Sequence, residues 1–168
     1  QIIEQTALRI NLPVQAIEKD IWVTTILQIV FSLPVAEHLI FKGGTSLSKA
    51  WGLINRFSED IDLAVNPIYL GVKEGDLTKK QIKKLRKASS LFVSEQLTPM
   101  LRTRLEELGL LAFLNVEAQP DGEGDNTYPE PRQIYVRYQS VFDKPLTYLR
   151  PDVVLEVSAR SLIEPSMP

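Results

Sequence analysis

The sequence predicts an α+β domain in which helices flank a mixed β-sheet. Two helical patterns precede the first extended run, a longer helical pattern occupies the middle of the chain, and three extended stretches follow it. The predicted order ααβαβ(α)βββ fits one mixed sheet packed against helices. Because a chain of 168 residues can bury one good core, we expect a single domain.

The first half of the chain supplies two helices and the first strands. Apolar periodicity predicts a short helix over 2–10 and a second helix that begins at Pro13 and stops near Pro34. Residues 39–41 predict a short buried strand. After Gly43 and Gly44, the apolar residues Leu47, Ala50, Trp51 and Ile54 recur at helical spacing and predict a further helix. Residues 59–65 then alternate polar and apolar side chains, which predicts a strand. The inward positions of that strand are Ile61, Leu63 and Val65.

The second half begins with a long helical pattern. Residues 78–81 have the form of a capping box at its start. Pro99 should kink or split the helix, and Gly109 should end it. The extended stretches that follow cover 111–118, 132–142 and 147–159. The segment 119–131, rich in Pro, Gly and Asp, predicts a mobile loop between the first two stretches.

Composition bounds the chemistry. Hydrophobic residues make up 44% and charged residues 24%, which is typical of a soluble globular protein. The absence of cysteine excludes disulfides and thiolate metal ligands, and fits a reducing cytoplasm. His38 is the only histidine, so carboxylates must do any metal binding, and His38 itself is better explained as structural than as catalytic.

Charge and hydropathy argue against two classes of partner, a membrane and a nucleic acid bound through overall positive charge. The most apolar run, 21–33, is too short to span a bilayer, and no signal peptide is evident, so we expect no membrane partner. A net charge of −2 argues against a globally basic nucleic-acid binder but allows a local patch. Residues 79–87 hold six cations and no acid. This run either steers an RNA acceptor or is a solvated helix face.

The strongest motif joins a glycine turn to two carboxylates. Asp60 and Asp62 are separated by one residue, so on a strand their side chains project from the same face. Two adjacent carboxylates repel each other and favour a hard divalent cation, Mg²⁺ or Mn²⁺. Gly43 and Gly44 precede a helical pattern, where backbone N–H groups bind phosphate. The sequence therefore predicts that phosphate and metal meet here.

Side chains after the glycines offer further phosphate contacts. The hydroxyls of Thr45 and Ser46 could hydrogen-bond to a nucleotide, although an ordinary strand-to-helix turn capped by Thr45 explains them too. Lys49, one turn later, could touch phosphate or be a solvated lysine. Lys42 could point to either side of the sheet.

The string from Phe41 to Leu63 resembles the nucleotidyltransferase superfamily signature, Gly-Gly-[Ser/Thr] followed by Asp-x-Asp. More narrowly, it is similar to AbiEii/AbiGii-type nucleotidyltransferase toxins of bacterial toxin–antitoxin systems. Arg56 and Ser58 occupy intervening positions of that family pattern, which implies a supporting role near the metal and nucleotide. The resemblance extends upstream to 18–20, whose charges could also serve surface pairing.

The resemblance implies a nucleotidyltransferase fold and a third carboxylate on a neighbouring strand. Glu156 is the best candidate for catalysis and metal binding, because an acid embedded in an apolar strand needs a reason. Asp152 is the rival, at the entrance of the same strand. If both share a strand face, both could reach the cleft.

The function that the resemblance implies is metal-dependent transfer of a nucleoside monophosphate from a nucleoside triphosphate to an acceptor hydroxyl. It implies further that the acceptor is RNA, at the 3′ end of tRNA, that a separate antitoxin is the partner, and that the protein is cytoplasmic. Relatives have a helical C-terminal half that includes a lysine touching the nucleotide. We therefore expect residues 1–163 to form the nucleotidyltransferase domain, N-terminal in a longer protein, and 164–168 to be a linker or cut end. An inactive nucleotide-binding or antitoxin-interaction domain is the alternative.

Overall fold

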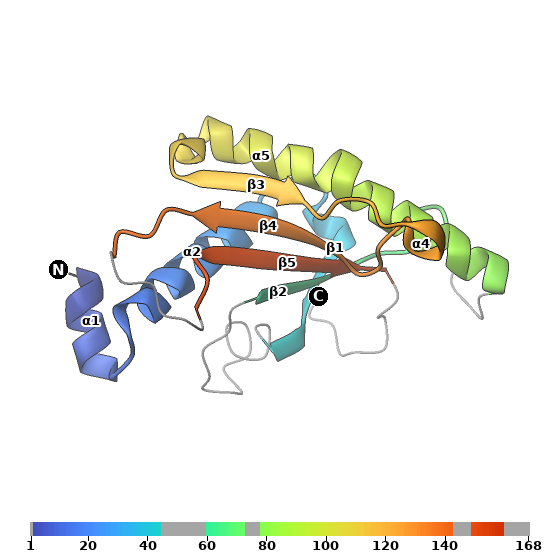
Figure 1. The fold of residues 1–168 in the computed structure, drawn as a ribbon. Helices are drawn as coiled ribbons and strands as arrows, with labels where there is room; N and C mark the ends of the chain where they lie inside the picture. Colours follow the sequence, from blue (N-terminus) through green and yellow to red (C-terminus); the bar gives the residue numbers. More distant parts are fainter. Residues whose placement is uncertain (1, 45–59, 73–77, 143–148, 160–168) are drawn as a thin grey trace.

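The computed structural model describes residues 2–44, 60–72, 78–142 and 149–159. Its centre is a five-stranded sheet with the strand order β1-β2-β5-β4-β3 (Figure 1). The strands are β1 (Leu39–Lys42), β2 (Asp60–Val65), β3 (Leu114–Ala118), β4 (Arg132–Tyr138) and β5 (Asp152–Ser158). The central pair, β2 and β5, is parallel, whereas the other neighbours are antiparallel. The predicted mixed sheet is confirmed.

One face of this sheet is covered by α2 (Val14–Val30), α4 (Lys79–Phe92) and α5 (Thr98–Glu107). The first helix, α1 (Ile2–Ile10), packs against α2. Figure 1 shows α2, α4 and α5 on the same side of the strands, and contacts join α2 to β2 and β5, α4 to β5, and α5 to β3. The predicted α+β class therefore holds.

The core lies between the helices and the sheet. On β2 the alternation is as predicted: Ile61, Leu63 and Val65 are fully buried. They join one apolar cluster with residues of all the other strands and of α2, α4 and α5. The opposite face of the sheet carries Asp60, Asp62, Gln133 and Glu156, whereas Arg132 of β4 is buried on the core side. We call this opposite face the polar sheet face.

The helix boundaries follow local chemistry. The hydroxyl of Thr78 accepts a hydrogen bond from the Gln81 backbone N–H, and the Gln81 side chain accepts one from the Thr78 N–H. This completes the predicted capping box. Downstream, a π-helical turn (Val93–Leu97) separates α4 from α5, because Pro99 has no N–H to donate to the preceding turn. Gly109, with φ +70°, follows the end of α5 as expected.

The extended stretches are shorter than predicted. A 3₁₀ turn over Leu110–Ala112 precedes β3, and β4 ends at Tyr138. The loop 119–131 has no strand but includes a 3₁₀ turn, Gly124–Asn126. Arg86 of α4 donates a hydrogen bond to the Tyr128 carbonyl in that loop. The loop is therefore fastened to α4.

Among the described residues, none of the helices combines the length and the apolar composition that crossing a bilayer requires.

Candidate functional site

Two acidic side chains of β2 face away from the core. Asp60 is exposed and Asp62 is half-buried, while Ile61 and Leu63 between and beside them are buried. Both aspartates therefore lie on the polar sheet face, as the i, i+2 spacing predicts. Each makes further interactions within the protein.

Glu156 lies directly beside Asp62. The two residues are Cα partners in the parallel β2–β5 ladder, where neighbouring strands are about 4.8 Å apart. Glu156 is half-buried, while Leu155 and Val157 on either side of it are fully buried. The acid is thus on the polar sheet face and its apolar neighbours are in the core.

Asp152, the alternative to Glu156, shares the sheet face but lies at the strand entrance. Its carboxylate is 3.8 Å from the Lys19 ammonium, which is almost completely buried. The two residues form an ion pair at the start of β5, four residues before Glu156. The geometry favours Glu156 over Asp152 as the neighbour of the two aspartates.

Gly43 lies against Asp62 on the side of β1. A Cβ atom added to Gly43 would lie 2.1 Å from the Asp62 carboxylate oxygen Oδ2. The backbone φ of Gly43 is +74°, which L side chains rarely adopt. Gly43 and Gly44 also begin a helical turn, so the predicted glycine turn lies next to the acidic pair.

The acidic residues fit a hard divalent cation in ligand type. Within the part of the chain that the structure describes, three or more acidic or histidine side chains do not converge into a ready metal site. Mg²⁺, however, is usually held by one or two carboxylates together with substrate phosphates. Asp62 and Glu156 supply two adjacent carboxylates, Asp60 lies two residues along β2, and Gly43 leaves the Asp62 carboxylate accessible at close range.

This geometry agrees with the comparison to known families. The family model described as nucleotidyl transferase AbiEii toxin, Type IV TA system, matches residues 26–168. The chain belongs to the AbiEii family. No curated protein and no solved structure is similar enough to the chain to count as a match.

AbiEii membership gives the chain its general role as a nucleotidyltransferase toxin of a toxin–antitoxin system, and a toxin of this kind implies a cognate antitoxin. The match covers the glycine turn, both aspartates and Glu156. Thr45, Ser46, Lys49, Arg56 and Ser58 fall inside the matched range but outside the described residues. Their predicted contacts with the nucleotide and metal stay predictions.

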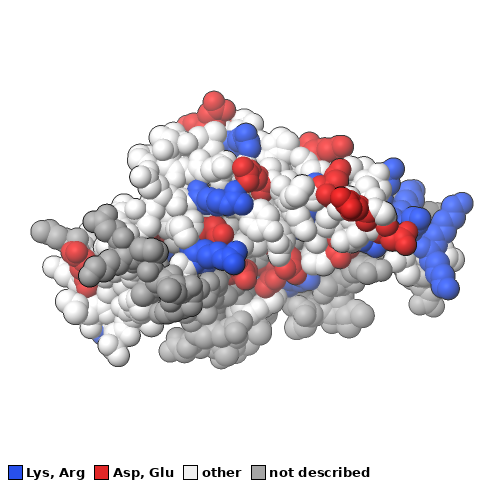
Figure 2. Space-filling model, viewed as in Figure 1, with Lys and Arg blue, Asp and Glu red and all other residues white. Residues whose placement is uncertain are grey.

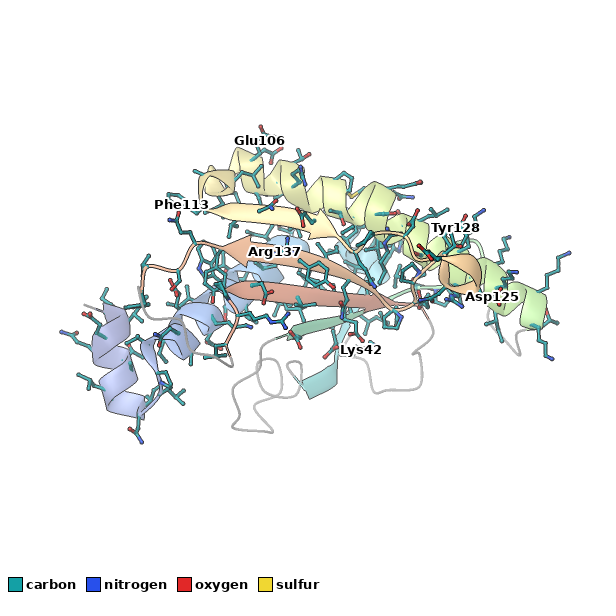
Figure 3. All side chains as sticks on the ribbon, viewed as in Figure 1. Lys42, Glu106, Phe113, Asp125, Tyr128 and Arg137 are labelled. Atoms are coloured by element: carbon teal, nitrogen blue, oxygen red, sulfur yellow. The ribbon has the colours of Figure 1, made fainter. Side chains whose placement is uncertain are left out.

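The side chain of Lys42 points to the polar sheet face of this AbiEii domain. Its Nζ donates a hydrogen bond to the Ser158 hydroxyl across 3.3 Å, and its Cα is paired with that of Asp62 (Figure 3). The sequence did not predict to which face of the sheet the Lys42 side chain points. Its pairing with Asp62 places it on the polar sheet face. A cation is therefore present beside the acidic pair.

Gln133 is a site neighbour that sequence reasoning missed. Its Nε2 donates a hydrogen bond to Glu156 Oε2 at 3.4 Å, and its Oε1 accepts one from the Tyr135 hydroxyl at 2.6 Å. Gln133 and Glu156 are Cα partners across the β4–β5 ladder. The available signal was the alternation of polar residues at 133, 135 and 137 with the apolar Ile134 and Val136.

The far edge of the polar sheet face holds an exposed ion pair between Arg137 and Glu117 (Figure 3). The hydrogen bond from Arg137 lowers the pKa of Glu117, and the same bond raises the pKa of Arg137. The Arg137 guanidinium also lies over the Tyr135 ring, 5.3 Å from its centroid. Charged contacts thus continue across β4 to β3.

The burial of Glu18 and Lys19 contradicts the interpretation that the charges of 18–20 serve pairing on the protein surface. Both side chains are almost completely buried. The Glu18 carboxylate accepts hydrogen bonds from the Ser140 hydroxyl at 2.6 Å and the Val141 N–H at 2.9 Å, whereas Lys19 donates to the Arg150 carbonyl at 3.3 Å. Adjacent residues of α2 therefore hold both ends of the connection between β4 and β5.

Proposed function

We propose that this chain transfers a nucleoside monophosphate from a nucleoside triphosphate to an RNA hydroxyl, at the 3′ end of tRNA. One observation supports this proposal above the others: Asp62 has a carboxylate neighbour, Glu156, on one side and a glycine turn without room for a side chain on the other. Carboxylates and a phosphate-binding turn are the two components that phosphoryl transfer needs.

Asp60, Asp62 and Glu156 would hold Mg²⁺, or Mn²⁺, together with the triphosphate. When bound, this ion neutralises charge on the phosphates and lowers the barrier to attack. Gly43 and Gly44 direct backbone N–H groups towards the phosphates, and Lys42 adds a positive charge beside Asp62.

The reaction also releases the proton of the acceptor hydroxyl, and a side chain of this chain can take it. The acceptor oxygen forms a bond to the α-phosphorus, the bond from that phosphorus to the oxygen bridging to the β-phosphate breaks, and pyrophosphate leaves. Glu156 accepts the hydroxyl proton. The amide of Gln133 holds Oε2 of Glu156 and thereby leaves Oε1 for this task. Membership of this toxin family supports the cytoplasm as the place of the reaction.

The test is incubation of the protein with Mg²⁺, RNA and each of four α-labelled nucleoside triphosphates. We expect label in small RNA with one or more nucleotides. Asp62→Asn and Glu156→Gln should lower the labelling rate by roughly 10²–10⁴-fold, the range measured for loss of a positioned acid or base. Glu106→Gln is the control, because Glu106 is exposed on α5 and its removal takes away one negative charge remote from the sheet face (Figure 3).

A binding domain without activity is the second candidate. It is favoured by the fact that the described acidic residues do not converge into a ready three-ligand site. In that case the wild type would bind nucleotide or antitoxin but label no RNA. Wild-type activity in both Asp62→Asn and Glu156→Gln would refute the catalytic assignment.

A further inference from the structure

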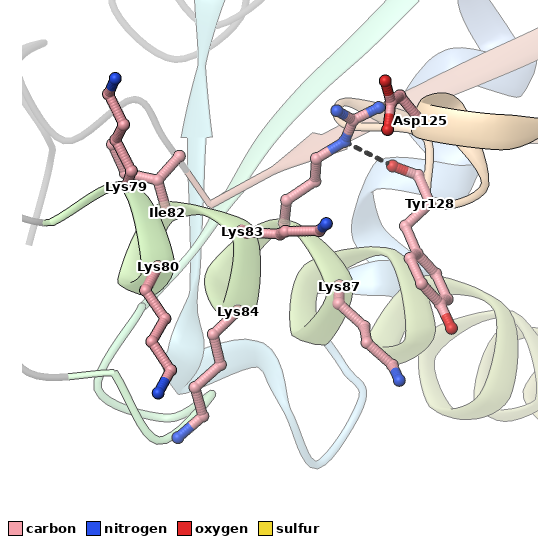
Figure 4. A pocket seen from close by; sticks show the side chains of 9 residues that line it. Lys79, Lys80, Ile82, Lys83, Lys84, Lys87, Asp125 and Tyr128 are labelled. Carbon is pink, nitrogen blue, oxygen red and sulfur yellow. Dashed lines mark hydrogen bonds between the residues drawn. The ribbon is translucent and has the colours of Figure 1, made fainter.

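A cleft lined by lysines lies at the start of α4, beside the loop 119–131. Its volume is about 440 Å³. Lys80, Lys84 and Lys87 recur at i, i+4 and i+7, and Figure 4 shows the first two pointing the same way and the third beside the Tyr128 ring. The cleft is completed by Lys79, Ile82, Lys83, Arg86 and Asp125.

The loop 119–131 forms one wall of the cleft and is held against α4 by side-chain contacts. Arg86 donates hydrogen bonds to the Tyr128 carbonyl at 2.8 Å and to the side chain of Asn126. Lys87 Nζ lies 5.1 Å from the centroid of the Tyr128 ring. These two cations fix the loop against the helix, and the lysines towards the start of α4 are left to face the cleft.

The lysines of α4 do not stabilise the helix. Helix α4 contains no acid, and among the described residues Lys79, Lys80, Lys83 and Lys84 have no ion pair. Like charges at i, i+4 destabilise a helix, and cations in the first turn oppose its dipole. A helix face selected only for solubility would intersperse acids with these lysines. Figure 2 shows the cations gathered at this end of the molecule.

We propose that this lysine cleft binds the phosphodiester backbone of a nucleic-acid strand. Phosphates repeat along a strand, and the lysines repeat every helical turn, about 5.4 Å, which is of the order of the spacing between neighbouring phosphates. Such contacts are independent of base sequence and need only a local patch, so they are compatible with a net charge of −2.

The cleft is linked to the acidic site through the loop that forms its wall. Glu130, two residues after Tyr128, accepts a hydrogen bond from the Ala159 N–H at 2.7 Å, directly after β5. Glu156 is three residues earlier on that strand. The inference rests on the proposed function and deepens it, because the cleft would hold the backbone of the acceptor whose end reacts at Glu156.

The test measures binding alone, by fluorescence anisotropy of a labelled RNA strand and of DNA with the same sequence, over a range of salt concentrations and without nucleotide. Lys80→Ser/Lys84→Ser should weaken RNA binding at least about tenfold and reduce the slope of log affinity against log salt by about 1.4, two contacts at about 0.7 each for a single strand. Arg9→Ser/Arg104→Ser removes the same charge from α1 and α5 and should leave both quantities near the wild-type values.

Equal losses in the two double variants, or binding without salt dependence, would overturn the proposal. Binding to DNA alone would overturn its link to an RNA acceptor. Thermal melting of each variant checks the fold, and loss of like-charge repulsion should not lower the melting temperature of Lys80→Ser/Lys84→Ser. The readout is binding without nucleotide and not transfer, so failure of the transfer proposal leaves the cleft separately testable.

Discussion

At the scale of single residues, Asp62 has neighbours of three kinds. Lys42 is its Cα partner on β1, Glu156 is its partner on β5, and Gly43 approaches its carboxylate. The cation reduces the repulsion between the two acids, and the glycine leaves their oxygens accessible. The chemistry of the site therefore depends on one glycine as much as on the acids.

Gly43→Ala should abolish RNA labelling and lower stability. The new Cβ would lie 2.1 Å from Asp62 Oδ2, so Asp62 must move, in addition to a cost of about 1 kcal/mol for an alanine at positive φ. Gly71→Ala is the matched control, because Gly71 has the same φ of +74° and open space around its Cβ position. Melting and labelling are measured for both variants. Normal labelling by Gly43→Ala would show that the close approach does not matter.

Gln133→Glu should lower the rate of RNA labelling more than Gln133→Ala does. A carboxylate at position 133 cannot donate the hydrogen bond that Gln133 Nε2 gives to Glu156 Oε2, and its charge repels Glu156. Gln133→Ala removes the hydrogen bond without adding charge, so its loss of rate should be smaller. The labelling rates of the two variants and the wild type provide the measurement. Equal rates for wild type and Gln133→Glu would exclude a positioning role for Gln133.

At the scale of elements, a buried arginine joins α4 to the sheet. Arg132, at the start of β4, is 4% exposed and donates hydrogen bonds to Ser90 of α4 and to the Gln119 carbonyl. Its guanidinium also lies 2.9 Å from the carboxylate of Asp121. One side chain thus fixes the helix, the strand and the loop between β3 and β4, and with them the wall of the lysine cleft.

Arg132→Met should lower the free energy of unfolding by about 1–3 kcal/mol, because the carbonyls of Ser90 and Gln119 lose a charged donor. Arg104→Met is the control. Arg104 pairs with Glu107 at 2.8 Å on the exposed side of α5, where such a pair is worth about 1 kcal/mol or less. Urea unfolding of both variants gives the comparison. Equal losses would mean that Arg132 does not fix these elements.

At the scale of the whole molecule, the polar sheet face couples stability to ligand binding. The carboxylates on β2 and β5 are crowded on this face, while the core on the other face needs no ion. A cation that binds only the folded chain stabilises all of it. The fold should therefore respond to Mg²⁺ through the acidic site.

Mg²⁺ at ten times its dissociation constant should stabilise the protein by about 1.4 kcal/mol, which raises the melting temperature by roughly 3–6 °C. Asp62→Asn should lose this gain, because one of the carboxylates that would hold the ion is gone. Calorimetry with and without Mg²⁺ measures the gain in each variant. An equal Mg²⁺ effect in Asp62→Asn would place the ion elsewhere.

The sequence by itself determined the features that depend on neighbouring residues: where helices begin and end, and which side chains share a strand face. The capping box at Thr78, the break before Pro99 and the shared face of Asp60 and Asp62 depend on residues only a few positions apart. For the same reason the glycine turn and the acidic pair could be predicted together. The family resemblance, which local patterns carried, is confirmed by the match over 26–168.

Only the tertiary structure decided which side chains meet across strands. The register of β2, β4 and β5 brings Gln133 and Glu156 to Asp62, and sheet pairing sets the direction of Lys42. The burial of Glu18 and Lys19 depends on a connection more than 120 residues away. Strand order and register result from packing the whole core, so no local pattern specifies them.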